Sequence, residues 1–209
     1  MSGFEGSITV APVRGRRERK HPLAGEGPIV DRARRALRFT AEQFGTVRRA
    51  DRTTVEVRTD DGIDLVLSYD PGNFIFSRVY AFTVSTVLPE TTAVPNGVKL
   101  THRGTPRGGA FVSRSGTGTD PSASPLLARL NAAASPHLAR IDMVHAGISG
   151  SSRRTLTLSP MGGAFVWVLI PPVFKATAFP QGEPARILDL IRAVRALGPT
   201  VSPSSSPAA

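Results

Sequence analysis

The sequence contains no cysteine, and this absence removes several kinds of chemistry at once. Without a thiol the chain has no disulfides, no thiolate metal ligands and no cysteine nucleophile. The residues after Met1 also lack the apolar stretch of a secretory signal peptide. Together these absences predict a cytoplasmic protein.

Long hydrophobic runs are missing as well. The longest, residues 163–174, is interrupted by Pro171 and Pro172, whereas a membrane-spanning helix needs about 20 apolar residues. We therefore predict no transmembrane segment and interpret residues 164–170 as a buried strand. Two alternatives are a peripheral membrane contact, supported by Phe179 and the basic N-terminal segment, and the wall of an apolar pocket.

Aromatic residues make up only 6% of the chain. No strand alternates aromatic with basic residues as RNA-binding strands do, so specific nucleic-acid recognition is less favoured than anion binding in general. Phe74, Phe76, Tyr80 and Phe82 share one parity of a predicted strand, which favours a core face over a base-stacking platform.

Catalytic and metal-binding patterns are absent too. The four histidines are not spaced like metal ligands. His145 lies near Asp142 and Ser149, but Ser149 stands in GISGS and not in a G-x-S-x-G elbow, so a hydrolase triad has little support. We expect no catalytic residue, no metal and no cofactor, and a non-enzymatic protein is the favoured interpretation.

The chain is rich in arginine, which supplies 23 of the 26 basic residues. Thirteen basic residues fall within the first 58 positions against seven acidic ones, so this stretch carries +6 of the total +10. Clustered guanidinium groups bind phosphates and carboxylates through their forked geometry and through counterion release. The candidate anion-binding residues are Arg16, Arg17, Arg19, Lys20, Arg34, Arg35 and Arg38. The alternative is a solvated charged face that reflects the codon usage of a GC-rich genome.

A second, weaker candidate is a glycine- and serine-rich loop followed by two arginines. Such a loop can hold a phosphate with its backbone amides. It has neither the strand–loop–helix context nor the Lys-Ser/Thr pair of a P-loop, so a plain hairpin loop is favoured. The residues of this possible phosphate loop are Gly150, Ser151, Ser152, Arg153 and Arg154.

The distribution of proline, glycine and apolar residues predicts a flexible basic arm (1–28), a single α+β domain (29–198) and a disordered tail (199–209). Within the domain, apolar spacing predicts a helix capped by Asp31 and stopped at Gly45, and a last helix over 184–197. Alternation predicts a hairpin over 53–69. Other expected elements are strands at 74–88, 98–102, 109–113 and 153–158, extended chain at 137–144, loops at 114–123 and 147–152, and a helix from Ser124 to Pro136.

This order of elements predicts a mostly antiparallel sheet with helices packed on one face. Residues 29–113 and 124–198 would form a diverged helix-plus-three-strand repeat. The leading functional hypothesis is a binding or adaptor protein that docks on an anionic partner, such as an acidic protein surface, a phosphate-rich polymer or anionic lipid. The alternatives are a small-molecule binder or cryptic enzyme, with an apolar pocket between the sheet and the last helix, and a subunit of a larger assembly. The sequence leaves the oligomeric state open.

Overall fold

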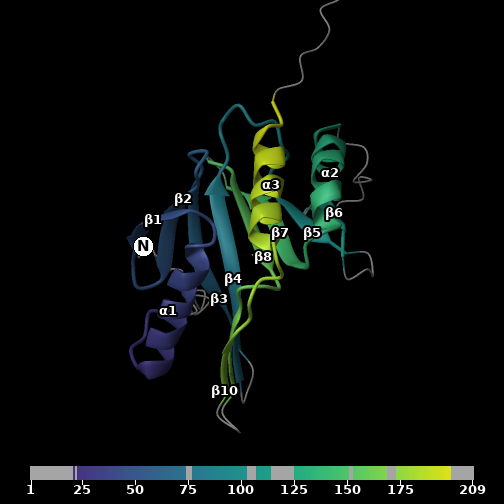
Figure 1. Cartoon of the computed structure of the whole chain (residues 1–209). Coiled ribbons are helices and arrows are strands. Elements are labelled where there is room, and N and C mark those ends of the chain that lie inside the picture. The colour runs from purple at the N-terminus through teal and green to yellow at the C-terminus, as the bar shows by residue number, and fades with distance from the viewer. Residues whose placement is uncertain are drawn as a thin grey trace, which may run out of the picture.

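The described residues fold into three helices and a ten-stranded sheet, and Figure 1 shows how these elements are arranged. The computed structural model describes His21 and residues 23–73, 77–102, 107–113, 125–150, 153–168 and 173–198. The elements are α1 (Pro28–Ala41), β1 (Thr46–Ala50), β2 (Thr54–Arg58), β3 (Asp64–Asn73), β4 (Ser77–Val87), β5 (Val98–Thr101), β6 (Ala110–Ser113), α2 (Pro125–Leu138), β7 (Met143–Ser149), β8 (Thr155–Pro160), β9 (Phe165–Val168), β10 (Val173–Ala176) and α3 (Glu183–Arg195).

The sheet is antiparallel at every pairing among the described strands, in the order β1-β2-β3-β4-β8-β7-β5-β6. The long strand β4 lies at its centre. One half of β4 pairs with β8 through Val84 and Leu158, and the other half pairs with β9 through Tyr80 and Phe165. The antiparallel α+β class expected from the sequence is therefore confirmed, while the internal repeat stays a prediction.

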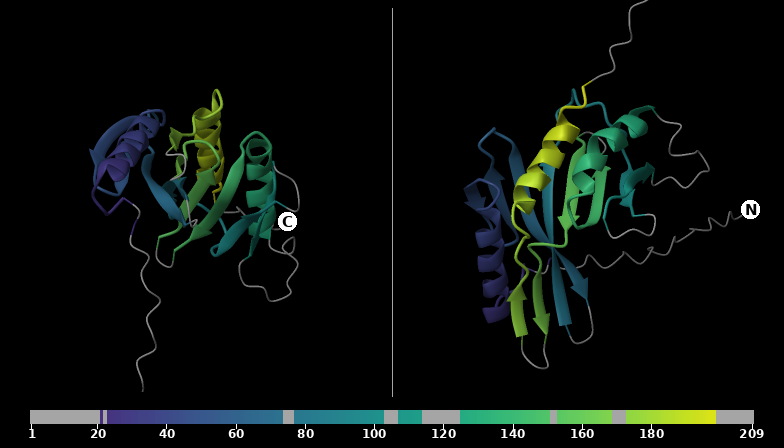
Figure 2. Two further views of the ribbon diagram at one scale, coloured as in Figure 1. Left: turned by 90° about the horizontal axis from the view of Figure 1, so that it is seen from below. Right: turned by 45° about the vertical axis from the view of Figure 1, so that its right-hand side comes forward.

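All three helices cover the same face of the sheet, which is clearest when the molecule is viewed from below (Figure 2). The strands alternate between buried and more exposed positions, as a sheet with one covered face requires. Leu37 of α1, Leu130 of α2 and Leu190 of α3 join the buried strand residues in one hydrophobic cluster. The apolar periodicity of each helix thus directs it onto a common core.

Aromatic rings fill the core beneath the end of α1. Phe179, from the segment before α3, makes edge-on contacts with Phe44 and Phe82, each with ring centroids 5.6 Å apart. Tyr69 and Tyr80 extend this group toward β9, with their ring centroids 6.1 Å apart. Tyr80 and Phe82 are buried, which confirms the core-face interpretation for them, whereas Phe74 and Phe76 lie outside the described residues.

Several element boundaries differ from the sequence-based expectations. Helix α1 begins at Pro28, with Gly27 at the cap position, so Asp31 lies in the first turn and not at the cap. Pro136 does not end α2 but lies inside its last turns, where the missing amide leaves only one carbonyl unpaired. Residues 147–149 are not a loop: Gly147 pairs with Thr157 within β7 and β8.

Candidate anion-binding site

The chain enters the folded part through His21 and Leu23. The ring Nε2 of His21 lies 3.0 Å from Oγ of Ser68 on β3, and Leu23 is completely buried. Burial lowers the pKa of His21, and nearby Asp70 partly opposes this effect. Residues 23–28, assigned to the arm from the sequence, are thus held against the sheet and the start of α1. The predicted anion-binding residues Arg16, Arg17, Arg19 and Lys20 lie outside the described residues.

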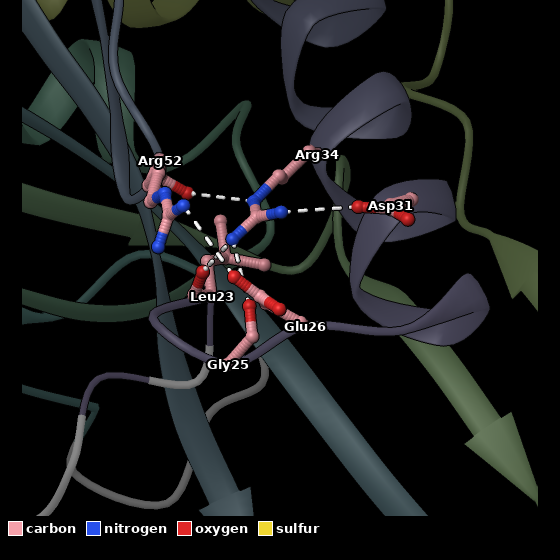
Figure 3. Close-up of polar contacts among 6 residues, drawn as sticks. All are labelled: Leu23, Gly25, Glu26, Asp31, Arg34 and Arg52. Atoms are coloured by element: carbon pink, nitrogen blue, oxygen red, sulfur yellow. Dashed lines mark hydrogen bonds and ion pairs between the residues drawn. The ribbon is translucent and has the colours of Figure 1, made fainter.

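Arg34 fastens this entering segment to the domain (Figure 3). Its Nη2 donates hydrogen bonds to the carbonyl oxygens of Leu23 at 2.7 Å and Gly25 at 2.8 Å, and its Nε donates to that of Arg52 at 3.1 Å. Its Nη1 forms an ion pair with Asp31 at 3.0 Å. The guanidinium donors of Arg34 are therefore used for structure, which leaves Arg34 poorly suited to bind an external anion.

Arg35 and Arg38 lie along a shallow groove between α1 and the β1–β2 hairpin, with a volume of about 230 Å³. We call this feature the arginine groove. One wall comes from α1 and the other from the end of β1 and the start of β2. The groove is lined by Arg34, Arg35, Leu37, Arg38, Ala50, Asp51, Arg52 and Val55. The fold thus adds Arg52, which the sequence interpretation did not select, to three arginines that it did.

The charges around the arginine groove are only partly neutralised. Arg38 lies 3.8 Å from Glu42, and Arg52 lies 3.5 Å from Glu26, with both pairs exposed. Exposed pairs of this kind contribute little free energy and exchange readily for another anion. Arg35 makes no hydrogen bond or ion pair within the part of the chain that the structure describes. Residues 26–52 contain seven arginines and four acidic residues, a net charge of +3.

Phe39 is an unexpected feature of the same helix. Its side chain is 71% exposed, although a phenylalanine normally lies in the core. It follows Arg35 by four residues, so the two side chains share one exposed stripe of α1. The sequence offered a signal for this residue, because Phe39 falls outside the apolar spacing of Ala33, Leu37 and Ala41.

The arginines of the edge strand β1 can be explained without an anionic partner. Arg48 and Arg49 lie on an edge of the sheet, and charged side chains at such an edge oppose pairing with another chain. Arg49 pairs with Asp51 at 3.1 Å. We therefore centre the candidate site on α1 and not on β1.

The possible phosphate loop is only partly within the described residues, because Ser151 and Ser152 lie outside them. Arg154 donates from Nη1 to the carbonyl oxygen of Val94 at 2.7 Å and from Nη2 to that of Glu90 at 3.3 Å, so it holds the loop before β5. Gly150 accepts a hydrogen bond at its carbonyl oxygen from Nδ2 of Asn96 at 2.7 Å. Arg153 is exposed. Gly150 and Arg154 thus hold neighbouring backbone in place, and no contact of this kind involves the exposed Arg153 within the described residues.

The structure does not bring His145, Asp142 and Ser149 together as a catalytic triad. His145 and Ser149 lie four residues apart on β7, a separation of about 13 Å along a strand. Asp142 instead pairs with Arg107, whose Nε lies 2.7 Å from its Oδ1. No cluster of three or more histidine or acidic side chains that could hold a metal occurs within the described ranges. Nor does any described helix have the length and apolar character required to cross a membrane.

The last helix packs its apolar stripe fully into the core. Ile187, Leu190, Ile191 and Val194 are all buried. A hollow of about 440 Å³ lies at the C-terminal end of the helix, where Arg195 lines it together with Thr86 and Val87. The sequence-based alternative of an apolar pocket along α3 gains no support from these residues.

One buried acidic residue was not singled out from the sequence. Glu183 begins α3 and is only 1% exposed, and its Oε1 has no hydrogen-bond partner within the described residues. Burial raises its pKa, and the carboxylate of Asp142 adds to the effect. In the sequence, Glu183 stands before Pro184 at the start of a predicted helix, and this position gave no sign that the side chain would be buried.

We expect Glu183→Gln to stabilise the protein at pH 8 relative to the parent, and much less so at pH 4. Because its pKa is raised in the folded state, folded Glu183 holds its proton to a higher pH than the unfolded chain does. The contribution of Glu183 to the free energy of unfolding is thus fully present below the pKa of the unfolded state, and it is lost as the pH rises through the pKa of the folded state. Thermal unfolding of both proteins at the two pH values measures the difference, and a variant less stable than the parent at pH 8 would contradict it.

Comparison with known proteins places the chain in one family. Searches among curated proteins and among solved structures give no match. One family profile matches residues 37–197, which span most of the chain from the second half of α1 to the end of α3. The matched range includes Arg38 and Arg52 of the arginine groove but begins after Arg34 and Arg35. The chain belongs to the family DUF3156, described as a protein of unknown function.

Proposed function

We propose that this protein is a non-enzymatic binding protein that docks on an anionic partner through the arginine groove. The observation that carries the proposal is the convergence of Arg35, Arg38 and Arg52 on one groove in which Arg35 is unpaired among the described residues. The basic residues Arg16, Arg17, Arg19 and Lys20 precede the point where the chain enters the domain and would add to the attraction. The lack of cysteine supports a cytoplasmic setting.

Guanidinium groups suit this role because each presents a planar fork of donors to carboxylate or phosphate oxygens. Binding an anion would replace the weak exposed pairs of Arg38 and Arg52 with a shared ligand and release counterions. The partner would be an acidic protein surface, a phosphate-rich polymer or anionic lipid. Since the family match begins at Leu37, we propose this function for the present chain and not for the whole family.

The test is the double charge reversal Arg35→Glu/Arg38→Glu, examined by elution from immobilised heparin and by co-sedimentation with vesicles that contain phosphatidylserine. We expect at least a tenfold loss of affinity at low salt, because two attractive charges become repulsive ones. Arg34 must stay unchanged, because its hydrogen bonds to Leu23 and Gly25 support the fold.

A matched control has the same change in net charge elsewhere on the surface. Lys99 and Arg140 are exposed, distant in sequence from the arginine groove and outside the possible phosphate loop, so Lys99→Glu/Arg140→Glu reproduces the loss of charge without altering the groove. Equal weakening by the two double variants would mean that binding follows net charge alone, and the arginine groove would lose its role. Polyglutamate as competitor then separates binding to carboxylates from binding to sulfate or phosphate groups.

A further inference from the structure

One outer side of α1 combines a large apolar side chain with several arginines. Phe39 is 71% exposed, and Arg32, Arg35 and Arg38 are exposed as well. The arginines follow one another at steps of three, and Phe39 follows Arg35 by four, so the four residues share the side of the helix that points away from the sheet. We call this side the Phe39 face. It adjoins the arginine groove, which Arg35 and Arg38 also line.

The packing of α1 does not require the ring of Phe39. Ala33, Leu37 and Ala41 are buried on the inward side of the helix. The helix packs mainly against β1, β2 and β3, whereas α2 and α3 pack on each other, so α1 stands at one side of the helical layer (Figure 1). A single exposed apolar residue is ordinary on a protein surface. The cations around this one make it informative, because an apolar ring among cations suits an anionic surface with an apolar interior.

The charge of α1 favours such a surface. The helix contains four arginines against Asp31, a net charge of +3. Asp31 is paired with Arg34 at 3.0 Å, and Glu42, just beyond the helix, lies 3.8 Å from Arg38. The acidic groups of this side are therefore engaged with arginines, while Arg35 has no partner among the described residues. An anionic surface would complement the remaining positive charge.

Anionic surfaces differ in what they offer to the ring of Phe39. A folded acidic protein would need a pocket shaped for a protruding ring, and a phosphate-rich polymer offers charge without an apolar medium. Single-stranded nucleic acid is usually held by several stacked aromatic side chains, whereas α1 has one. The headgroup layer of an anionic membrane accepts a protruding ring without a prepared pocket and attracts arginines at the same time.

We propose that the Phe39 face docks on a membrane surface that contains anionic lipid. The ring of Phe39 inserts among the headgroups, and Arg32, Arg35 and Arg38 lie against the lipid phosphates and carboxylates. This inference rests on the anion-binding function proposed above and names its partner. Each arginine near an anionic membrane strengthens binding about fivefold, and partial burial of the ring adds a similar factor. The contact is therefore peripheral and reversible, and it depends on both signals.

The test is Phe39→Ala, measured with vesicles of equal parts phosphatidylcholine and phosphatidylserine and with immobilised heparin. We expect the affinity for vesicles to fall about fivefold, because the apolar anchor is lost. Elution from heparin and thermal unfolding should stay unchanged, since every arginine remains and the ring lies outside the core. Phe39→Leu keeps an apolar anchor and should bind the vesicles nearly as well as the parent.

The absence of cysteine allows insertion to be observed directly. Phe39→Cys, labelled with a nitrobenzoxadiazole group, should gain fluorescence and shift to shorter wavelength on the anionic vesicles, because this apolar fluorophore takes the place of the ring. Ser135→Cys is the matched control. Ser135 is exposed on α2, and the residues one turn away from it are uncharged, so its label should not respond.

The outcomes separate this proposal from the role of the arginine groove. Equal vesicle affinity of Phe39→Ala and the parent, or an equal response of the labels at positions 39 and 135, would overturn membrane docking. Loss of heparin binding in Arg35→Glu/Arg38→Glu would then still support docking on another anionic partner. A similar loss of vesicle and heparin affinity in Phe39→Ala would also contradict the proposal, because heparin has no apolar layer. If Arg35→Glu/Arg38→Glu and its charge control bind both materials equally, both proposals fail.

Discussion

Replacing Arg34 by methionine should lower the free energy of unfolding by about 2–3 kcal/mol, whereas the same change at Arg35 should alter it by less than about 0.5 kcal/mol. The two residues are neighbours on α1, but their guanidinium groups have different surroundings. Arg34 donates to the carbonyl oxygens of Leu23, Gly25 and Arg52. Arg35 has no such partner within the described residues. Methionine keeps the apolar stem of arginine and removes only the donors.

Urea denaturation of the two variants tests this difference. Arg34→Lys serves as the conservative control, because it keeps the charge but cannot supply donors in the same fixed fork; we expect a stability between those of the parent and the methionine variant. A similar loss at both positions would mean that Arg34 is not the fastening residue. The comparison also identifies which arginine can be changed in binding experiments without harm to the fold.

Gly45→Ala should destabilise the protein by about 3 kcal/mol or more, although it adds only a single methyl group. Gly45 has a φ of +147°, which residues with a side chain rarely adopt. An added Cβ would also collide with the carbonyl oxygen of Arg58 and lie 2.9 Å from Cα of Thr59. These are backbone atoms of a paired strand, so the collision cannot be relieved by a side-chain rotation.

Gly27→Ala is the matched control. Gly27 has a similarly unusual φ of +122°, but nothing lies within 4 Å of its would-be Cβ. It should lose only about 1 kcal/mol, through backbone strain alone. Thermal unfolding of both variants measures the difference, and equal losses would show that collision contributes nothing at Gly45. Because Gly45 joins α1 to β1, we also expect the alanine variant to distort the arginine groove.

The elements that the sequence predicted well have strong local signals. The hairpin of β2 and β3 alternates in polarity around a turn with Gly62, and the structure confirms that these two strands pair, with Val57 opposite Leu65. The start of α3 at Glu183, beside Pro184, and its apolar stripe were equally clear. Such elements can be predicted from local periodicity, because the spacing of their own apolar residues shows which face of the helix or strand is buried.

Other elements depend on contacts between distant parts of the chain and were missed. Strand β1 reads TVRRA and has no apolar alternation, because it lies exposed at an edge and forms only by pairing with β2. Pro136 is accommodated within α2 because it lies near the end of the helix, where its missing amide costs one hydrogen bond. Leu23 is buried against the folded domain. The polar, proline-containing segment around it gave no sign of this burial.

The candidate site was predictable only in part for the same reason. Arg34, Arg35 and Arg38 are equivalent in a charge count, and only the fold separates Arg34, with its bonds to backbone carbonyls, from the more exposed Arg38. Arg52 joins the groove through the path of the β1–β2 hairpin. The hydroxyl of Tyr80 is buried and has no hydrogen-bond partner among the described residues; the sequence cannot indicate this, because the partners of a buried group depend on its neighbours in space.

The central position of β4 also bears on how the protein is made. Its partner on one side, β3, immediately precedes it, but Val84 pairs on the other side with Leu158. At about 5–20 residues per second, a ribosome needs roughly 4 to 15 s to add the intervening stretch. During that interval the nascent chain presents an unpaired strand edge and an incomplete core, since α3 is still to be synthesised. We therefore expect the first half of the protein to depend more than the second on chaperones and on uninterrupted translation.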